Sequence, residues 1–91
     1  MELLSTRQVA AMRAAGAVAA QTLQRVGRAL RPGMTGAAID ALVRADTAER
    51  GARCAQLGYH GFPGAVCVSI DDVACHGIPG PQVLAEGQLV S

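Results

Sequence analysis

The sequence has 91 residues, which is enough for one small domain or for part of a larger one. Its formal net charge is +1, and its eight basic residues, all arginine, are spread from Arg7 to Arg53, which argues against a nucleic-acid-binding surface. Three cysteines without a close pair argue against a disulfide framework and favour a reducing compartment. Because neither a secretory signal nor a run of ~18 apolar residues is visible, we expect a cytoplasmic protein without membrane contact.

Hydrophobic residues make up 51% of the sequence, but alanine supplies much of that fraction. With no Trp, one Tyr and one Phe, few large side chains are present to fill a core. A domain of this composition is expected to be only marginally stable alone. We therefore predict that the chain is a piece of something larger.

A long amphipathic helix is predicted over residues 6–30. Ser5 and Gln8 have the spacing of a capping box at its start. Apolar or small residues then recur in steps of three and four, which places them on one helical face: Val9, Met12, Gly16, Ala19, Leu23, Val26 and Leu30. Gly16 and the alanines make one side flat, so we expect packing across a sheet; a coiled-coil seam is the alternative.

A second helix is predicted over residues 36–50, with Thr35 as its N-cap and Gly51 as the glycine that ends it. Its predicted buried stripe consists of Ile39, Leu42 and Val43. Its predicted solvent face consists of Arg44, Asp46, Glu49 and Arg50.

After residue 51 the pattern favours strands. Residues 52–57 are a candidate short strand, and residues 65–70 (AVCVSI) are rich in β-forming residues. Asp71-Asp72 is predicted to turn the chain so that residues 73–76 return as a hairpin partner. A rigid loop follows over residues 77–81, then a turn at Glu86-Gly87 and the start of a strand at residues 89–91. The predicted class is α+β, with two helices packed on an antiparallel sheet.

The segment from Gly58 to Pro81 holds both histidines, the only Tyr, the only Phe and two of the three cysteines. A histidine between a strand end and Gly-Ile-Pro has little freedom, which suits a preorganised hydrogen-bond or acid–base group. From spacing alone, a satisfied buried histidine explains His76 equally well. A zinc site is disfavoured, because there is no CxxC and Cys75 and His76 are adjacent.

Four runs of residues carry a family resemblance: Met12-Arg13-x-Ala15-Gly16; Leu30-Arg31-Pro32-Gly33-Met34-Thr35; Gly58-Tyr59-His60-Gly61-Phe62-Pro63; and Cys67-x-Ser69-x-x-x-Val73-x-Cys75-His76-Gly77-Ile78-Pro79. In this order and spacing they resemble type I methionine aminopeptidase over nearly all of the chain. The resemblance implies a partial pita-bread (creatinase/aminopeptidase) fold, with residues 1–91 as the N-terminal half of the catalytic domain. It also implies removal of the initiator methionine from nascent proteins with two divalent metal ions (Co, Mn, Fe or Zn). The implied partner is a nascent peptide with N-terminal Met, and the ribosome is a candidate partner.

The resemblance also implies roles for single residues. His76 matches the catalytic histidine that hydrogen-bonds the substrate near the scissile amide. Tyr59, Phe62 and Cys67 match positions that line the methionine side-chain pocket, and His60 is expected near its entrance. Plain core packing is the alternative for Phe62 and Cys67. The backbone carbonyls of Asp71 and Val73 match positions that help to hold a monovalent cation.

The sequence departs from the family at Gln56 on the pocket rim, at Gly64-Ala65 and at Asp71. The five metal ligands of the family all match positions downstream of Ser91. We therefore expect a chain truncated before its metal ligands, which binds no metal and is inactive alone. The alternatives are a non-catalytic pita-bread protein that binds a partner and, less favoured, an unrelated helix–sheet domain.

Overall fold

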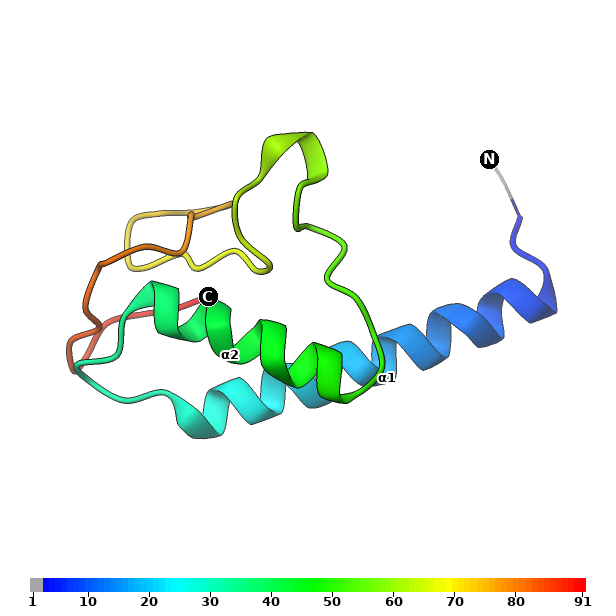
Figure 1. Cartoon of the computed structure of the whole chain (residues 1–91), viewed down its shortest axis with the longest axis horizontal. Helices are drawn as coiled ribbons and strands as arrows, with labels where there is room; N and C mark the ends of the chain where they lie inside the picture. Colours follow the sequence, from blue (N-terminus) through cyan, green and yellow to red (C-terminus); the bar gives the residue numbers. More distant parts are fainter. Residues whose placement is uncertain (1–2) are drawn as a thin grey trace.

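The computed structural model describes residues 3–91, and two helices dominate this part of the chain (Figure 1). Helix α1 spans Thr6–Ala29 and helix α2 spans Gly36–Glu49. The two helices lie side by side and run in opposite directions. The remaining residues are irregular except for one 3-10 turn, η1, at Tyr59–Gly61. Residues 52–91 fold back against α2 and supply the rest of the core.

Both predicted helices are confirmed to within one residue at each end, and their caps follow the predicted chemistry. The Ser5 hydroxyl accepts from the Gln8 N–H at 3.1 Å, and the Gln8 side chain accepts from the Ser5 N–H at 2.8 Å. The Thr35 hydroxyl accepts from the Ala38 N–H at 3.0 Å. Gly51 ends α2 with φ of 73°, a conformation that glycine adopts without strain.

The predicted antiparallel sheet is not formed by residues 3–91, and the predicted strands at 52–57, 65–70 and 73–76 are wrong for this part of the chain. Only two isolated bridges occur there, Thr35 to Val83 and Ile70 to Val90. Ser69 and Ser91 exchange two backbone hydrogen bonds of 2.8 Å. The expected hairpin keeps two backbone bonds: the Val73 N–H donates to the Ile70 carbonyl at 3.1 Å, and the Val68 N–H donates to the Gly77 carbonyl at 2.9 Å.

The physical reason lies in the backbone between these segments. Asp71 and His76 both have positive φ, 52° and 54°, which turns the chain sharply at each end of the second predicted strand. A ladder needs successive paired residues, and the bends leave room for only one or two. The predicted turns at 71–72 and 86–87 are present, so the β-forming run is extended but lacks a continuous partner.

The core is small, as the composition predicted. Its buried members come from α2 and from residues 65–84: Ile39, Val43, Ala65, Val68 and Leu84. The chain exposes 6656 Å², whereas a folded globular protein of its mass of 9.3 kDa exposes roughly 5,000 Å². Its radius of gyration is 14.6 Å, against roughly 12 Å expected for 91 residues. The chain is therefore more open than an ordinary domain of its size.

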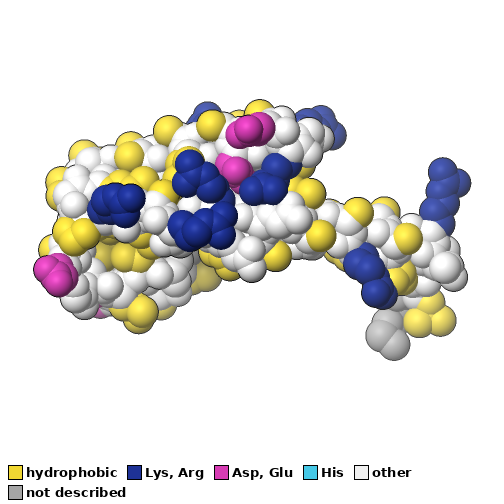
Figure 2. Space-filling model, turned by 90° about the horizontal axis from the view of Figure 1, so that it is seen from below, with side chains coloured by type: hydrophobic (Ala, Val, Ile, Leu, Met, Phe, Trp, Pro, Cys, Tyr) yellow, Lys and Arg dark blue, Asp and Glu magenta, His cyan; other side chains and the backbone are white. Residues whose placement is uncertain are grey.

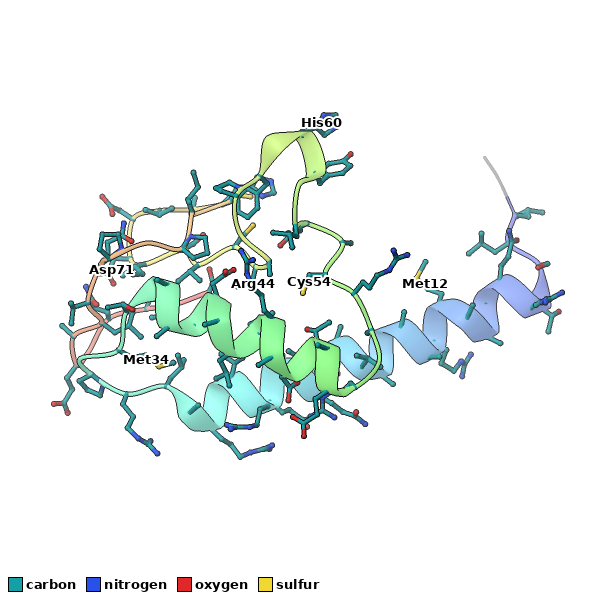
Figure 3. All side chains as sticks on the ribbon, in the orientation of Figure 1. Met12, Met34, Arg44, Cys54, His60 and Asp71 are labelled. Carbon is teal, nitrogen blue, oxygen red and sulfur yellow. The ribbon has the colours of Figure 1, made fainter. Side chains whose placement is uncertain are left out.

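Much of the excess surface belongs to the first half of α1. Residues 6–17, here called the arm, are all exposed, and Figure 2 shows the arm projecting from the rest of the molecule. Met12, labelled on the arm in Figure 3, is 64% exposed. At Gly16 an added Cβ would meet nothing within 4 Å, so the expected close packing across a sheet is wrong here. Of the predicted stripe, only Val26 and Leu30 pack on the core.

Two residues of α2 differ from their predicted faces. Leu42, predicted in the buried stripe, is only half-buried and does not belong to the core cluster. Asp46 is buried rather than exposed to solvent, and its carboxylate accepts from Arg50 Nε at 2.8 Å. Arg50 also donates to the side-chain oxygen of Gln21 in α1, at 2.8 Å. The Arg50 guanidinium holds the pKa of Asp46 below its ordinary value. Burial is tolerated because the charge is paired, and the pair links the two helices.

Candidate functional site

All five side chains that the sequence singled out line one hollow. Its volume is about 530 Å³, and its walls are Gln56, Tyr59, His60, Gly61, Phe62, Pro63, Cys67, His76 and Ile78. These residues come from two segments, 56–67 and 76–78, which the turn of the intervening residues brings together. The hollow is mostly apolar, with two imidazoles, a phenol, an amide and a thiol in its walls. That composition is typical of a small-molecule or side-chain binding pocket.

The first wall is a tight loop built on η1. Gly58, His60 and Gly61 all have positive φ, and His60 reaches 47° without being a glycine. Backbone bonds close the loop on itself: the Phe62 N–H donates to the Tyr59 carbonyl at 2.9 Å, and the Gly58 N–H to the Phe62 carbonyl at 3.0 Å. The Tyr59 and His60 rings meet edge to face with centroids 4.3 Å apart. Figure 3 shows His60 at the outer tip of this loop, consistent with a place at the entrance of the hollow.

His76 forms the opposite wall. Its side chain is exposed, so the alternative of a buried, structurally satisfied histidine is excluded by the structure. Its Nδ1 lies 3.6 Å from Cys67 Sγ, across the extended segments. The next residue, Gly77, donates its N–H to the Ser69 hydroxyl at 3.1 Å, while its carbonyl accepts from Val68. His76 is therefore held in a left-handed conformation by bonds on its neighbour, which restricts where its ring can lie.

Glycine at position 77 is a steric requirement. A Cβ added there would overlap the carbonyl oxygen of Val68, which is backbone and cannot move aside easily. The close approach of residues 68 and 77 is what places His76 beside Cys67. The Gly-Ile-Pro run after His76 thus has a specific structural role in addition to rigidity.

Phe62 and Cys67 are both half-buried, and neither belongs to the buried core cluster. Plain core packing, the alternative raised from the sequence, therefore describes them poorly. Tyr59 is 66% exposed and is one of the residues that line the hollow. Gln56, which departs from the family pattern, is also in the wall.

A buried carboxylate that no sequence motif marked holds residues 58–77, here called the site loop, against α2. Asp40, 8% exposed, accepts from the backbone N–H groups of Ala65 at 2.6 Å and Val66 at 3.3 Å. It also accepts from Arg44 Nε at 2.8 Å, and Arg44 in turn donates to the Pro63 carbonyl at 3.2 Å. Figure 3 shows Arg44 rising from α2 toward this loop. The one signal in the sequence for this arrangement was the i, i+4 spacing of Asp40 and Arg44, which is typical of an ion pair on a helix.

Asp71 fixes the turn between Cys67 and His76. Its carboxylate accepts from the Leu89 N–H at 3.0 Å and from the Gln88 side chain at 3.2 Å. The carboxylate is thus engaged by the protein itself. The cation site at the carbonyls of Asp71 and Val73 remains a prediction.

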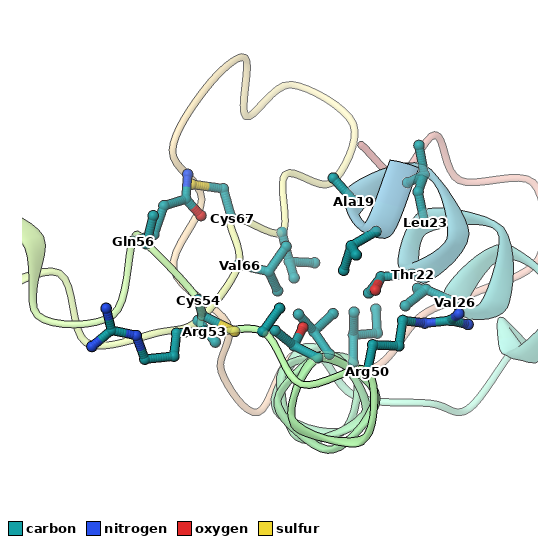
Figure 4. Close-up of a pocket in the computed structure, with 18 of the residues that line it drawn as sticks. Ala19, Thr22, Leu23, Val26, Arg50, Arg53, Cys54, Gln56, Val66 and Cys67 are labelled. Carbon is teal, nitrogen blue, oxygen red and sulfur yellow. The ribbon is translucent and has the colours of Figure 1, made fainter. Parts of the chain in front are cut away.

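A larger hollow of about 950 Å³ lies between α1, α2 and residues 50–56 and 65–68 (Figure 4). Its walls are mainly alanine, valine, leucine and isoleucine, with few groups that carry chemistry. We interpret it as uncovered core surface, in keeping with the large exposed area of the chain. Cys67 lies in the walls of both hollows.

Among residues 3–91 there is no group of three or more His, Cys, Asp or Glu side chains that could hold a metal ion. The residues described here therefore do not fit a dinuclear metal site, and we assign no step through a metal to them. In the same part of the chain, no helix has both the length and the apolar character needed to cross a membrane.

Comparison with known proteins agrees with the resemblance. Metallopeptidase family M24 matches residues 10–91. The chain is 43% identical over 88 residues to methionine aminopeptidase 1 of Mycobacterium tuberculosis, covering 96% of the chain and 33% of that protein. It is 40% identical over 90 residues to the mitochondrial methionine aminopeptidase 1D of Dictyostelium discoideum, covering 99% of the chain and 22% of that protein.

A solved structure, methionine aminopeptidase from Rickettsia prowazekii, matches 99% of the chain with a TM-score of 0.95 and 34% identity. This chain covers 36% of that one, so it spans about a fifth to a third of the length of these relatives. The matched region therefore shares the fold of the corresponding part of a methionine aminopeptidase. Because the family match covers most of its residues, the chain belongs to metallopeptidase family M24, among the relatives of the methionine aminopeptidases.

Proposed function

We propose that this chain is the N-terminal part of a metal-dependent methionine aminopeptidase and forms the substrate-side wall of its active site. The observation that carries the proposal is the meeting of His76, Tyr59, Phe62, Cys67 and His60 around one hollow. The names of the relatives and the family point to the same activity. No observation favours the non-catalytic, partner-binding alternative.

The hollow suits a methionine side chain. Two aromatic rings and a thiol offer polarisable surface to a flexible thioether, and such sulfur–aromatic contacts are favourable. Tyr59 and Phe62 would contact the side chain, and Cys67 would lie where the two segments meet. His60, at the outer tip of the loop, would lie beside the incoming peptide. Gln56 would place an amide in the same wall.

His76 would donate a hydrogen bond to the substrate close to the scissile amide. Its exposed ring faces the hollow and its backbone is held by the bonds of Gly77. A donor whose position is fixed before the reaction stabilises charge that develops in the transition state without reorganisation. We therefore expect the contact to affect turnover more than substrate binding.

The metal ions are proposed for the longer protein. Membership of a metallopeptidase family implies divalent metal. Two ions, cobalt, manganese, iron or zinc, would be held by another part of that protein, since residues 3–91 supply no suitable cluster. The peptide substrate with N-terminal Met is the proposed partner. Ribosome association and a cytoplasmic location stay predictions, and one relative is mitochondrial by name.

A chimera tests the proposal. The 91 residues replace the matched third of the Rickettsia prowazekii enzyme, and methionine release from a Met-Ala-Ser peptide is measured. We expect the chimera to release methionine and the isolated chain to release none. In the chimera, His76→Asn should lower kcat by about a hundredfold with little change in KM, because asparagine keeps the left-handed backbone but removes the imidazole. A folded chimera without turnover, or an unchanged kcat in the variant, would contradict the proposal.

A further inference from the structure

Arg44 of α2 is bonded to the wall of the smaller hollow that carries Phe62. Its Nη2 donates to the carbonyl of Pro63 at 3.2 Å, and Pro63 itself lines the hollow. Nε of the same guanidinium donates to Asp40 at 2.8 Å. Two nitrogens of one planar group are thus engaged, which fixes the side chain. Because Pro63 directly follows Phe62, the bond acts on the backbone that places the aromatic ring.

The opposite wall of the hollow is fixed to the first turn of the same helix. The Ala37 N–H donates to the Gly80 carbonyl at 2.8 Å. Pro79 packs on the first wall, since a Cβ added at Gly64 would lie 2.9 Å from the Pro79 ring. Ile78, which lines the hollow, directly precedes this contact. Both walls are therefore attached to α2, and their separation depends on bonds to that helix.

Arg44 differs from Asp40 in burial. The Arg44 side chain is 46% exposed, whereas Asp40 is buried. An ion pair that reaches the solvent contributes little to the free energy of unfolding. A substitution of Arg44 should therefore change the position of the site loop more than the stability of the chain.

We propose that Arg44 is a positioning residue, which acts through the Pro63 carbonyl to fix Phe62 where the hollow receives a methionine side chain. The inference rests on the proposed function of the hollow. Arg44 lies outside the lining of the hollow, so its effect is on substrate binding and not on turnover, which depends on His76. Lysine does not replace it, because a single ammonium group lacks the fork that reaches two acceptors.

Amide hydrogen exchange of the 91-residue chain, followed by NMR, tests the position of the loop without any substrate. The N–H groups of Gly58 and Phe62 close the site loop on itself. In Arg44→Lys both should exchange about fivefold faster, the effect expected for one lost hydrogen bond. The Ala37 N–H, bonded to the other wall, should keep its rate. Unchanged rates at Gly58 and Phe62, or equal acceleration of all three amides, would overturn the proposal.

The matched control is Arg50→Lys. Arg50 has the same arrangement on the same helix: its Nε donates to Asp46 at 2.8 Å, and a second nitrogen donates to Gln21 at 2.8 Å. These bonds face α1 and not the site loop. The exchange rates of Gly58 and Phe62 should therefore stay the same in this variant, and acceleration equal to that in Arg44→Lys would refute a specific role for Arg44.

The chimera with the Rickettsia prowazekii enzyme tests the consequence for the substrate. Arg44→Lys should raise KM for the Met-Ala-Ser peptide about fivefold with little change in kcat, and Arg50→Lys should change neither. A fall in kcat at constant KM, or no change, would contradict the positioning role. If the parent chimera shows no turnover, the proposed function fails, while the exchange rates still decide whether Arg44 positions the loop.

Discussion

The arm of α1 and the loop that carries the site contrast sharply. The arm is regular helix with a correct capping box, yet residues 6–17 are all exposed and bury no apolar side chain. The segment 58–77 has almost no regular structure and three non-glycine residues with positive φ lie within or beside it. Nevertheless Asp40 and Arg44 of α2 hold its residues 63–66, and the Ser69 hydroxyl holds Gly77 at its end.

The contrast shows that a segment can have regular secondary structure without packing on the rest of the protein, and can pack on it without regular secondary structure. Helix α1 follows from local propensity and capping, which need no partner. The site loop follows from a few polar contacts to α2 and from glycines that allow close backbone approach. The chemistry lies in the second kind of region, where backbone strain can be held by the surrounding structure.

The largest expected loss of stability comes from a substitution in the site loop. Gly77→Ala should destabilise the chain by about 3 kcal/mol or more, because the new Cβ overlaps the Val68 carbonyl and the backbone must shift. In the arm, Gly16→Ala meets open space and should instead stabilise the helix by about 1 kcal/mol. Urea unfolding followed by circular dichroism measures both. Equal effects of the two substitutions would remove the distinction between the regions.

Asp40→Asn should destabilise by about 2 kcal/mol, because it removes the charge that Arg44 and two backbone N–H groups share. The matched control is Asp72→Asn, at an exposed carboxylate for which no ion pair is found within residues 3–91, and its expected effect is below ~0.5 kcal/mol. The free energy of unfolding from urea titration checks both. A stability of Asp40→Asn equal to that of the control would show that the carboxylate does not hold the loop.

A third pair compares apolar side chains. Val43→Ala should lower stability by about 1.5 kcal/mol, since it removes buried methyl groups from the core. Met12→Ala in the arm should change stability by less than ~0.5 kcal/mol, since Met12 is already exposed. Thermal unfolding of both variants measures the difference. A loss of stability in Met12→Ala as large as that in Val43→Ala would mean that the arm is packed.

The smallest expected effect is on the pH dependence of stability, through the ion pair of Asp46 and Arg50. Because Arg50 holds the pKa of Asp46 below its ordinary value, the ion pair stabilises the fold above that value. Its contribution is lost as the pH falls from 3.8 through the lower folded value. We expect the melting temperature of Asp46→Asn to depend less on acid in this range than that of the parent. Parallel acid sensitivity of the two proteins would contradict the linkage.

The helices were predictable because their signals are local. Ser5 and Gln8 begin α1, Thr35 begins α2, and Gly51 ends it. The site residues were predictable because four motifs in order resemble one family, and the hollow confirms that these residues meet. Their individual roles stay predictions.

Two features were not predictable from local signals: the failure of residues 65–76 to form a hairpin, and the contact of Asp40 with the site loop. Residues 65–70 have strand composition, but strand formation requires partners over several residues, and bends at Asp71 and His76 leave too few. Asp40 is 25 positions from the Ala65 N–H that it accepts from, and no short-range pattern encodes such a contact. Asp46 looked like a surface residue until the packing of α1 on α2 buried it beside Arg50.

The most direct test of the proposed methionine pocket is a nuclear Overhauser experiment on the chain with a Met-Ala-Ser peptide at millimolar concentration. Tyr59 and Phe62 are the only Tyr and the only Phe, so their ring signals are identified at once. We predict contacts from the ε-methyl group of the peptide's methionine to both rings, which disappear with an Ala-Ala-Ser peptide. Contacts to side chains of the larger hollow, such as Val43 and Leu23, with none to the two rings, would contradict the account.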